Sequence, residues 1–127
     1  SKKINLSRPS VKERIDKMLD KGIIEHFTVI VDPKKIGRKL VFYIELANLN
    51  ISHNTFVEKM LEKEIITEIH AVTGKNNYIM KASTPDVETM NELLEELMGY
   101  GKVETSIVLN SPLKRKVLLP FNEDDEN

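Results

Sequence analysis

Residues 40–49 have the sequence LVFYIELANL, and this stretch decides the fold of the chain. As in any β-strand, its side chains alternate between two faces. Apolar residues occupy both faces: Leu40, Phe42, Ile44 and Leu46 on one, and Val41, Tyr43, Ala47 and Leu49 on the other. A strand with apolar side chains on both faces is typically buried on both. The sheet that contains it therefore needs a covering layer on each side.

The segments after this strand predict one α+β domain. Strands are expected over residues 65–73, 78–82 and 103–109, with a hairpin turn at residues 74–77. Two helices are expected, one capped by Ser52 or Asn54 that buries Phe56, Val57, Met60 and Leu61, and one starting at 84–86 that buries Val87, Met90, Leu94, Leu97 and Met98. The order β-α-β-β-α-β is the ferredoxin-like plan. Residues 117–119 are a candidate edge strand.

Two helices cover only one face of a ferredoxin-like sheet. The other apolar face of the strand at 40–49 needs cover as well, and a second copy of the same sheet supplies it. We therefore predict a two-fold homodimer with the sheets packed face to face. This domain is expected to span residues 38–120, and an acidic tail follows at 121–127.

Residues 1–24 have a different pattern, that of a partial helix-turn-helix. Ser7 is suited to cap a helix over about residues 8–21, and Gly22 suits the left-handed position that ends one. The inner side of this helix carries an apolar stripe made of Val11, Ile15, Met18 and Leu19. Residues 25–37 follow as a linker strand and a turn.

The charges of the chain are divided unevenly along the sequence. Residues 1–40 hold eleven Lys and Arg against five Asp and Glu, a net charge of +6. Residues 41–127 hold eight against fifteen, a net charge of −7. A basic part on an acidic body suggests that the basic part meets a polyanion such as DNA, although a solvated helix face gives the same pattern.

Composition excludes several classes of protein. The chain has no cysteine, which removes disulfides, thiolate metal sites and a cysteine nucleophile. The three histidines are dispersed, and neither a metal-ligand spacing nor a phosphate-binding glycine loop is present. No apolar run approaches the roughly 20 residues that span a bilayer. We therefore expect a cytoplasmic protein that is not an enzyme, with no cofactor, no metal and no membrane partner.

Five stretches resemble the leucine-responsive and asparagine-operon regulators of bacteria and archaea, the Lrp/AsnC family. They are residues 6–15 (LSRPSVKERI), 22–24 (GII), 31–37 (VDPKKIG), 71–78 (AVTGKNNY) and 103–109 (VETSIVL). Each stretch is weak alone, but the five occur in the family's order and spacing. The resemblance implies a helix-turn-helix joined to a ferredoxin-like ligand-sensing domain that forms homodimers or octamers. It also implies transcription regulation, commonly in response to amino acids.

In such a regulator the helix at 8–21 is expected to lie in the major groove of DNA. The candidate DNA-binding residues are Ser7, Arg8, Ser10, Lys12, Arg14 and Lys17. Arg pairs with two acceptors of guanine, whereas Lys more often contacts phosphate. We therefore assign base reading or anchoring to Arg8 and Arg14, and backbone contacts to Lys12 and Lys17.

The resemblance also suggests an effector site around the hairpin turn. Its candidate residues are Thr73, Gly74, Asn76, Asn77, Thr105 and Ser106. Family members usually carry Asp where this chain has Asn77, and that carboxylate lies near the ammonium group of an amino-acid effector. Asn77 keeps an acceptor but has no charge to neutralise an ammonium. Either the effector differs, or the turn has only a structural role, for which Gly-Lys-Asn-Asn is suitable.

Family members also have a helix and most of a second helix before the position of Lys3. Here only residues 1–5 match that second helix, so we expect the chain by itself to bind DNA weakly or not at all. The alternative function is a stand-alone small-molecule sensor or oligomerisation module that does not bind DNA.

Overall fold

The chain divides into two compact units, residues 1–31 and residues 32–127. The computed structural model describes residues 8–121. In the first unit, α1 (Arg8–Asp20) is followed by residues 25–31, which have no regular secondary structure. None of the helices in the described part of the chain is both long and apolar enough to cross a membrane.

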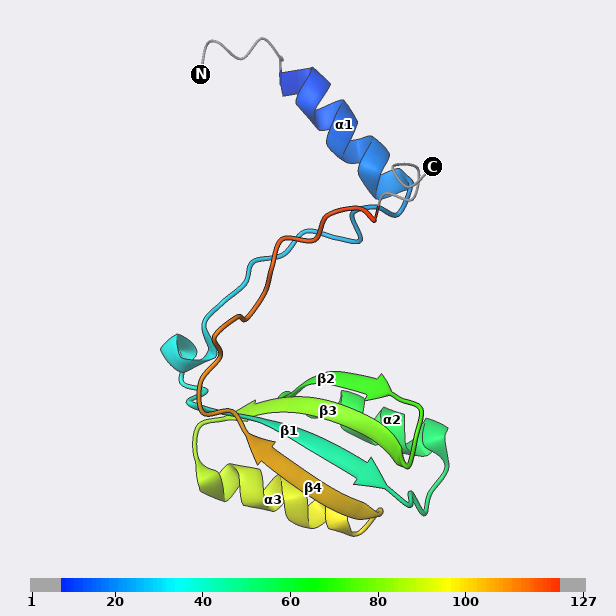
Figure 1. Cartoon of the computed structure of the whole chain (residues 1–127), viewed down its shortest axis with the longest axis vertical. Helices are drawn as coiled ribbons and strands as arrows, with labels where there is room; N and C mark the ends of the chain where they lie inside the picture. Colours follow the sequence, from blue (N-terminus) through cyan, green and yellow to red (C-terminus); the bar gives the residue numbers. More distant parts are fainter. Residues whose placement is uncertain (1–7, 122–127) are drawn as a thin grey trace. The chain divides into compact units, whose positions relative to one another are not determined.

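The second unit contains a four-stranded antiparallel sheet in the order β2-β3-β1-β4 (Figure 1). Its elements, in chain order, are the 3-10 helix η1 (Pro33–Ile36), β1 (Leu40–Ala47), α2 (His53–Leu61), β2 (Ile66–Ala71), β3 (Asn76–Thr84), α3 (Val87–Met98) and β4 (Lys102–Ile107). β1 lies between β3 and β4, so the stretch that decides the fold is a central strand. The predicted ferredoxin-like plan is therefore confirmed.

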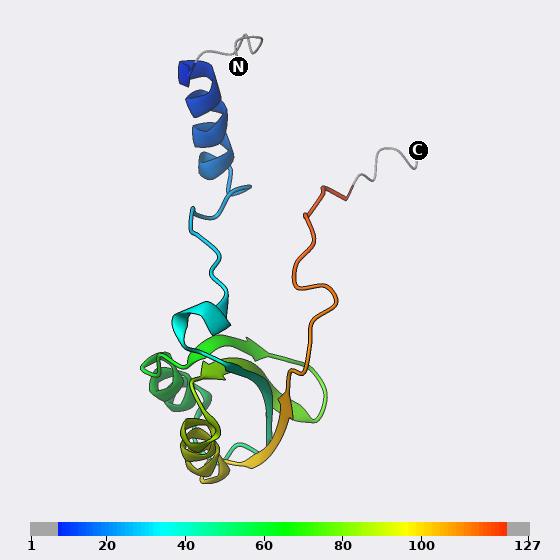
Figure 2. The same ribbon diagram turned by 90° about the vertical axis from the view of Figure 1, so that its left-hand side faces the viewer.

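Both helices of this unit lie against the same face of the sheet (Figure 2). The core lies between them and that face, and its buried apolar members are Phe42, Ile44, Leu46, Phe56, Met60, Tyr78, Met80, Ala82, Met90, Leu93 and Leu97. Alternate residues of β1 and β3 enter this core, which fixes the strand register because a slip by one residue would expose the whole set.

The buried side of α2 is shorter than predicted. Phe56 and Met60 are buried as expected, but Leu61, the last residue of the helix, is 72% exposed.

The buried side of α3 also differs from the prediction. Met90 and Leu97 are buried as expected, but the third buried position is Leu93. Val87 and Met98 are 52% and 58% exposed. The buried stripe thus follows a spacing of three and four residues, which places both ends of the helix outside the contact with the sheet.

Three predicted extended segments have different bounds or are absent. Asn76 and Asn77 belong to β3, so the turn before it covers residues 72–75 rather than 74–77. The predicted linker strand within 25–37 is wrong, because residues 25–32 form no strand and η1 follows. The edge strand at 117–119 is also wrong, since these residues are unstructured and more than three-quarters exposed. Apolar sequence alone does not hold a strand that has no neighbouring strand to pair with.

Candidate functional site

The first candidate surface is α1, whose C-terminus is closed by backbone hydrogen bonds. Gly22 has a φ of +79°. The Ile23 N–H donates to the Met18 carbonyl oxygen over 2.8 Å, and the Gly22 N–H donates to that of Leu19 over 3.1 Å. These two bonds around a left-handed glycine form a Schellman motif. The predicted role of Gly22 as the helix terminator is confirmed.

The basic side chains predicted to contact DNA project from this helix. Lys12, Arg14 and Lys17 are exposed, whereas Ser10 is half-buried. Lys12 Nζ lies 3.0 Å from Asp16 Oδ2, in an exposed pair one helical turn apart. Such pairs contribute only about 0.3–0.5 kcal/mol, so a phosphate can replace the carboxylate at little cost. Ser7 and the side chain of Arg8 lie outside the described residues.

The second candidate surface is the turn between β2 and β3, where Gly74 adopts a φ of +103°. Thr73 and Gly74 are exposed, and the two asparagines that follow are half-buried. The Asn77 side-chain oxygen accepts a 2.9 Å hydrogen bond from the Leu49 N–H, just after β1. Asn76 Nδ2 donates to Glu45 Oε2 over 3.4 Å. Asn77 therefore has a structural contact, which does not depend on a charge at this position.

The structure places Thr105 and Ser106 away from that turn within one chain. Thr105 pairs with Ile44, and Ala47 is the β1 residue that pairs with Asn76. Thr105 is thus three residues along the strand from the level of Asn76 and two strands across, a distance of roughly 14 Å. Thr105 lies on the helix-covered face of the sheet, and Ser106 lies on the other. One protomer does not bring the six candidate effector residues together.

The face of the sheet opposite the helices carries a mixture of polar, charged and apolar side chains. We call it the open face; it is formed by Val41, Tyr43, Glu45, Ala47, Glu68, His70, Ile79, Lys81, Ser83, Lys102, Glu104 and Ser106. Tyr43 lies on β1, a central strand of this face, and is 38% exposed. Lys81 Nζ lies 5.8 Å from the centroid of the Tyr43 ring. Lys81 and His70 also contact Glu68, at 3.9 Å and 2.9 Å. Polar contacts thus link three of the four strands across this face.

Sequence reasoning missed several residues around the candidate sites. Glu45 and Glu104 face each other across β1 and β4, an unfavourable arrangement for two like charges on an isolated sheet. His53 Nδ1 lies 2.9 Å from the Tyr78 hydroxyl oxygen, next to the predicted effector turn. The period-two pattern of β1 places Glu45 on the open face, but neither cross-strand partner follows from local sequence.

A shallow groove of about 290 Å³ lies elsewhere in the second unit. It is lined by Lys63, Glu64, Ile65, Thr89, Glu92, Leu93 and Glu96, none of which is a candidate effector residue. Lys63 Nζ and Glu96 Oε1 form a 2.6 Å ion pair in it. Within residues 8–121 no group of three or more His, Asp or Glu side chains is arranged to hold a metal ion.

Comparison with known proteins places this geometry in a family. Residues 42–118 match the model of the Lrp/AsnC ligand binding domain. The transcriptional regulator AzlB of Bacillus subtilis is 34% identical over 130 residues, which cover 97% of this chain and 82% of that protein. The HTH-type transcriptional regulator LrpB of the same species is 29% identical over 102 residues, covering 80% of this chain and 68% of LrpB.

Solved structures share the fold. B. subtilis LrpC superposes with a TM-score of 0.80 at 24% identity, over 90% of this chain and 81% of that chain. The feast or famine regulatory protein Rv3291c from M. tuberculosis, complexed with L-methionine, has a TM-score of 0.79 at 16% identity, over 94% of this chain and 83% of its own. The family model covers more than half of the chain, and the AzlB match extends over nearly all of it. This chain therefore belongs to the Lrp/AsnC family, whose ligand-binding domain it contains.

Proposed function

We propose that this chain is a DNA-binding transcription regulator that dimerises through its ferredoxin-like domain and responds to an amino acid or a related small effector. The observation that carries the proposal is the extent of the AzlB match, which covers 97% of this chain, so that a transcriptional regulator aligns with α1 as well as with the sheet. Because a regulator must reach the chromosome, the proposal includes a cytoplasmic location. It does not include a catalytic role.

The proposed dimer interface is the open face. Tyr43 presents a partly exposed aromatic ring there, and aromatic residues are enriched at protein interfaces relative to the rest of the surface. A two-fold axis sets this face against a copy of itself. In that arrangement the Lys81 and Lys102 side chains face the second copy, where they can offset the repulsion between Glu45 and Glu104. Further association into octamers belongs to the same proposal.

The proposed effector site lies at the turn that carries Thr73, Gly74, Asn76 and Asn77. Two structural neighbours are described as complexes with L-methionine, Rv3291c and the Neisseria meningitidis regulator NMB0573. We extend this ligand class to the present chain. Because Thr105 and Ser106 lie far from the turn in one protomer, a site that uses all six residues must include residues of a second protomer. An effector of that kind shifts assembly only if it binds the different assemblies unequally.

The first test is the mass of the purified assembly by light scattering, with and without L-methionine and then other amino acids. A dimer or larger assembly whose mass shifts with one compound is the expected result. A monomer under all conditions would contradict the dimer and the shared effector site.

The DNA-binding part is tested with Lys17→Ala and duplex DNA of mixed sequence at low salt. Loss of one phosphate contact should reduce the magnitude of the negative slope of log K against log salt by about 0.9, with no change in sequence preference. If amino acids shift the assembly while Lys17→Ala leaves the salt slope unchanged, Lys17 of α1 makes no phosphate contact, and only the sensing part of the proposal stands.

A further inference from the structure

Residues 32–39, which we call the basic turn, connect the linker to β1. Their sequence, DPKKIGRK, contains four basic residues and one acid. The acid, Asp32, is occupied as the N-cap of η1, where its Oδ1 accepts a 3.1 Å hydrogen bond from the Lys34 N–H. Gly37, with a φ of +88°, ends the 3-10 helix. The turn is thus fully formed by its own capping interactions.

Arg38 attaches this turn to the sheet domain. Its Nη1 donates to the Glu64 carbonyl oxygen over 3.1 Å and to Ser83 Oγ over 3.3 Å. The Arg38 N–H also donates to the Pro33 carbonyl oxygen over 2.7 Å. The side chain therefore joins the turn to the loop before β2 and to β3. Its acceptors are neutral, so they do not offset the charge of Arg38, and the basic turn has a net charge of +3 from four basic residues and one acid.

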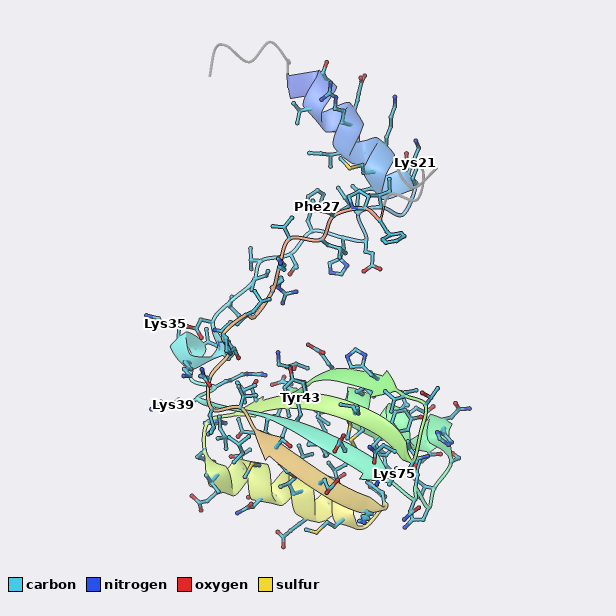
Figure 3. The ribbon with its side chains drawn as sticks, viewed as in Figure 1. Lys21, Phe27, Lys35, Lys39, Tyr43 and Lys75 are labelled. Carbon is cyan, nitrogen blue, oxygen red and sulfur yellow. The ribbon has the colours of Figure 1, made fainter. Side chains whose placement is uncertain are left out.

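The three lysines of the basic turn project into solvent. Lys34, Lys35 and Lys39 are exposed, and none of them forms an ion pair in the described part of the chain. Figure 3 shows Lys35 and Lys39 at one end of the sheet, and Lys75 of the proposed effector turn at the other. Three free ammonium groups on a clamped turn form a preorganised site for an anionic surface, because little further ordering is needed on binding.

We propose that the basic turn is a second DNA-backbone contact, separate from α1 and from the effector turn. This inference rests on the proposed DNA-binding function. The residues between α1 and the turn, 21–31, span at most roughly 40 Å when extended, which is comparable with the 34 Å of one helical turn of B-DNA. One duplex can therefore contact both surfaces. Phosphate contacts carry no sequence information, so the basic turn contributes affinity rather than specificity.

The test compares Lys34→Ala/Lys35→Ala with Lys59→Ala/Lys114→Ala, a control that removes two exposed positive charges elsewhere in the same unit. Binding of the 127-residue chain to duplex DNA of mixed sequence is measured from low to moderate salt. The first variant should lower the slope in magnitude, making the negative slope of log K against log salt shallower by about 1.8, or about 0.9 for each phosphate contact. The control should leave the slope unchanged.

Arg38→Gln tests whether the hydrogen bonds of Arg38 to Glu64 and Ser83 hold the basic turn in place. Two quantities are measured: the affinity for duplex DNA, and the electron paramagnetic resonance spectrum of a spin label attached at Lys35→Cys. The chain has no native cysteine, so the label is site-specific. Because Arg38 is a positioning residue, the variant should increase label mobility and weaken DNA binding several-fold while the salt slope stays the same. A label at Lys75→Cys, at the other end of the sheet, should keep its mobility.

The outcomes separate this inference from the proposed function. A slope unchanged by Lys34→Ala/Lys35→Ala, or lowered equally by the control, overturns the basic turn as a DNA contact. If Lys17→Ala still lowers the slope in that case, the proposed function stands. A slope lowered by the turn variant but not by Lys17→Ala leaves the turn contact and removes the role of α1. A chain that binds no duplex DNA at low salt refutes the basic turn as a DNA contact, because the turn is fully formed in this chain. It does not refute the proposed function, since weak or absent binding through α1 is already expected of the chain by itself.

Discussion

Gly101 lies where the loop before β4 passes the end of β1. A Cβ at this position would meet the Ala47 carbonyl oxygen at 2.4 Å and the Asn48 carbonyl oxygen at 3.1 Å. Both atoms belong to the backbone, so the loop must move to accommodate a methyl group. We expect Gly101→Ala to lower the free energy of unfolding by about 1–3 kcal/mol, measured by urea denaturation.

The matched control is Gly99→Ala, in the same loop. Gly99 has φ −71° and ψ −17°, a conformation open to alanine, and its closest Cβ contact would be 3.2 Å. Its effect should be clearly smaller. Equal losses from the two variants would mean that the close approach to β1 is not the cause.

Asn77 is the residue at which structure and recognition can be separated. Asn77→Ala leaves the Leu49 N–H without its acceptor and should cost about 1–3 kcal/mol of stability. Asn77→Asp keeps the acceptor and adds a charge, so its stability should stay close to that of the parent.

If the effector carries an ammonium, Asn77→Asp should bind L-methionine at least about tenfold more tightly by calorimetry, which corresponds to about 1.4 kcal/mol. Unchanged affinity would place the ammonium away from position 77.

Among the elements, α3 depends on its N-cap. Asp86 Oδ1 accepts hydrogen bonds from the Thr89 N–H at 2.8 Å and from the Thr89 hydroxyl at 2.7 Å. These bonds favour the ionised form and lower the pKa of Asp86 below its ordinary 3.8. The stabilisation is therefore present above pH 3.8 and is lost as the pH falls through the lower pKa of the folded state.

Asp86→Ala should accordingly lower the melting temperature at neutral pH, and the difference from the parent should narrow in acid. Asp86→Asn keeps an oxygen acceptor and should lose less at neutral pH. Calorimetric melting curves of the three chains from pH 7 to below 3.8 measure this. A difference that is constant across this range would mean that the charge of Asp86 makes no contribution.

The stability of the other long helix, α1, depends on what covers its apolar side. At 13 residues it is near the length at which isolated helices are marginal in water. Val11 is 41% exposed, and the rest of the apolar stripe is half-buried. The stability of α1 therefore depends on burial of that stripe, in addition to the Schellman motif at Gly22.

At the scale of the whole molecule, the main question is whether the open face is the surface through which two copies of the chain pack together. If the sheets of two copies pack there, Tyr43→Asp places a charge in the interface and should halve the mass of a dimer in light scattering. Leu61→Asp is the matched control, because Leu61 is 72% exposed on α2, on the other side of the sheet. Loss of the dimer in both variants, or in neither, would locate the interface elsewhere.

Local pattern was sufficient for much of the fold. The apolar residues of LVFYIELANL predict a β-strand, and Phe56 and Met60 are buried as helical spacing requires. It failed for the ends of α3 and for the segments at 25–31 and 117–119. In those places burial depends on which neighbour is present, and the local sequence does not contain that information.

The candidate sites divide in the same way. The exposed face of α1 and the glycine of the turn between β2 and β3 follow from sequence, because capping and turn geometry are local. The separation of Thr105 from Asn76 depends on sheet register, which sets distances between residues far apart in the chain.

By itself, the sequence determined the order of the elements, the two sets of residues that alternate along β1 and the glycine that ends α1. These properties arise from side-chain period and from backbone conformation over a few residues. Only the tertiary structure decided that Asn77 binds the Leu49 N–H and that Arg38 joins the basic turn to Glu64 and Ser83. The physical reason is that such contacts form only after the sheet has brought together segments more than twenty residues apart.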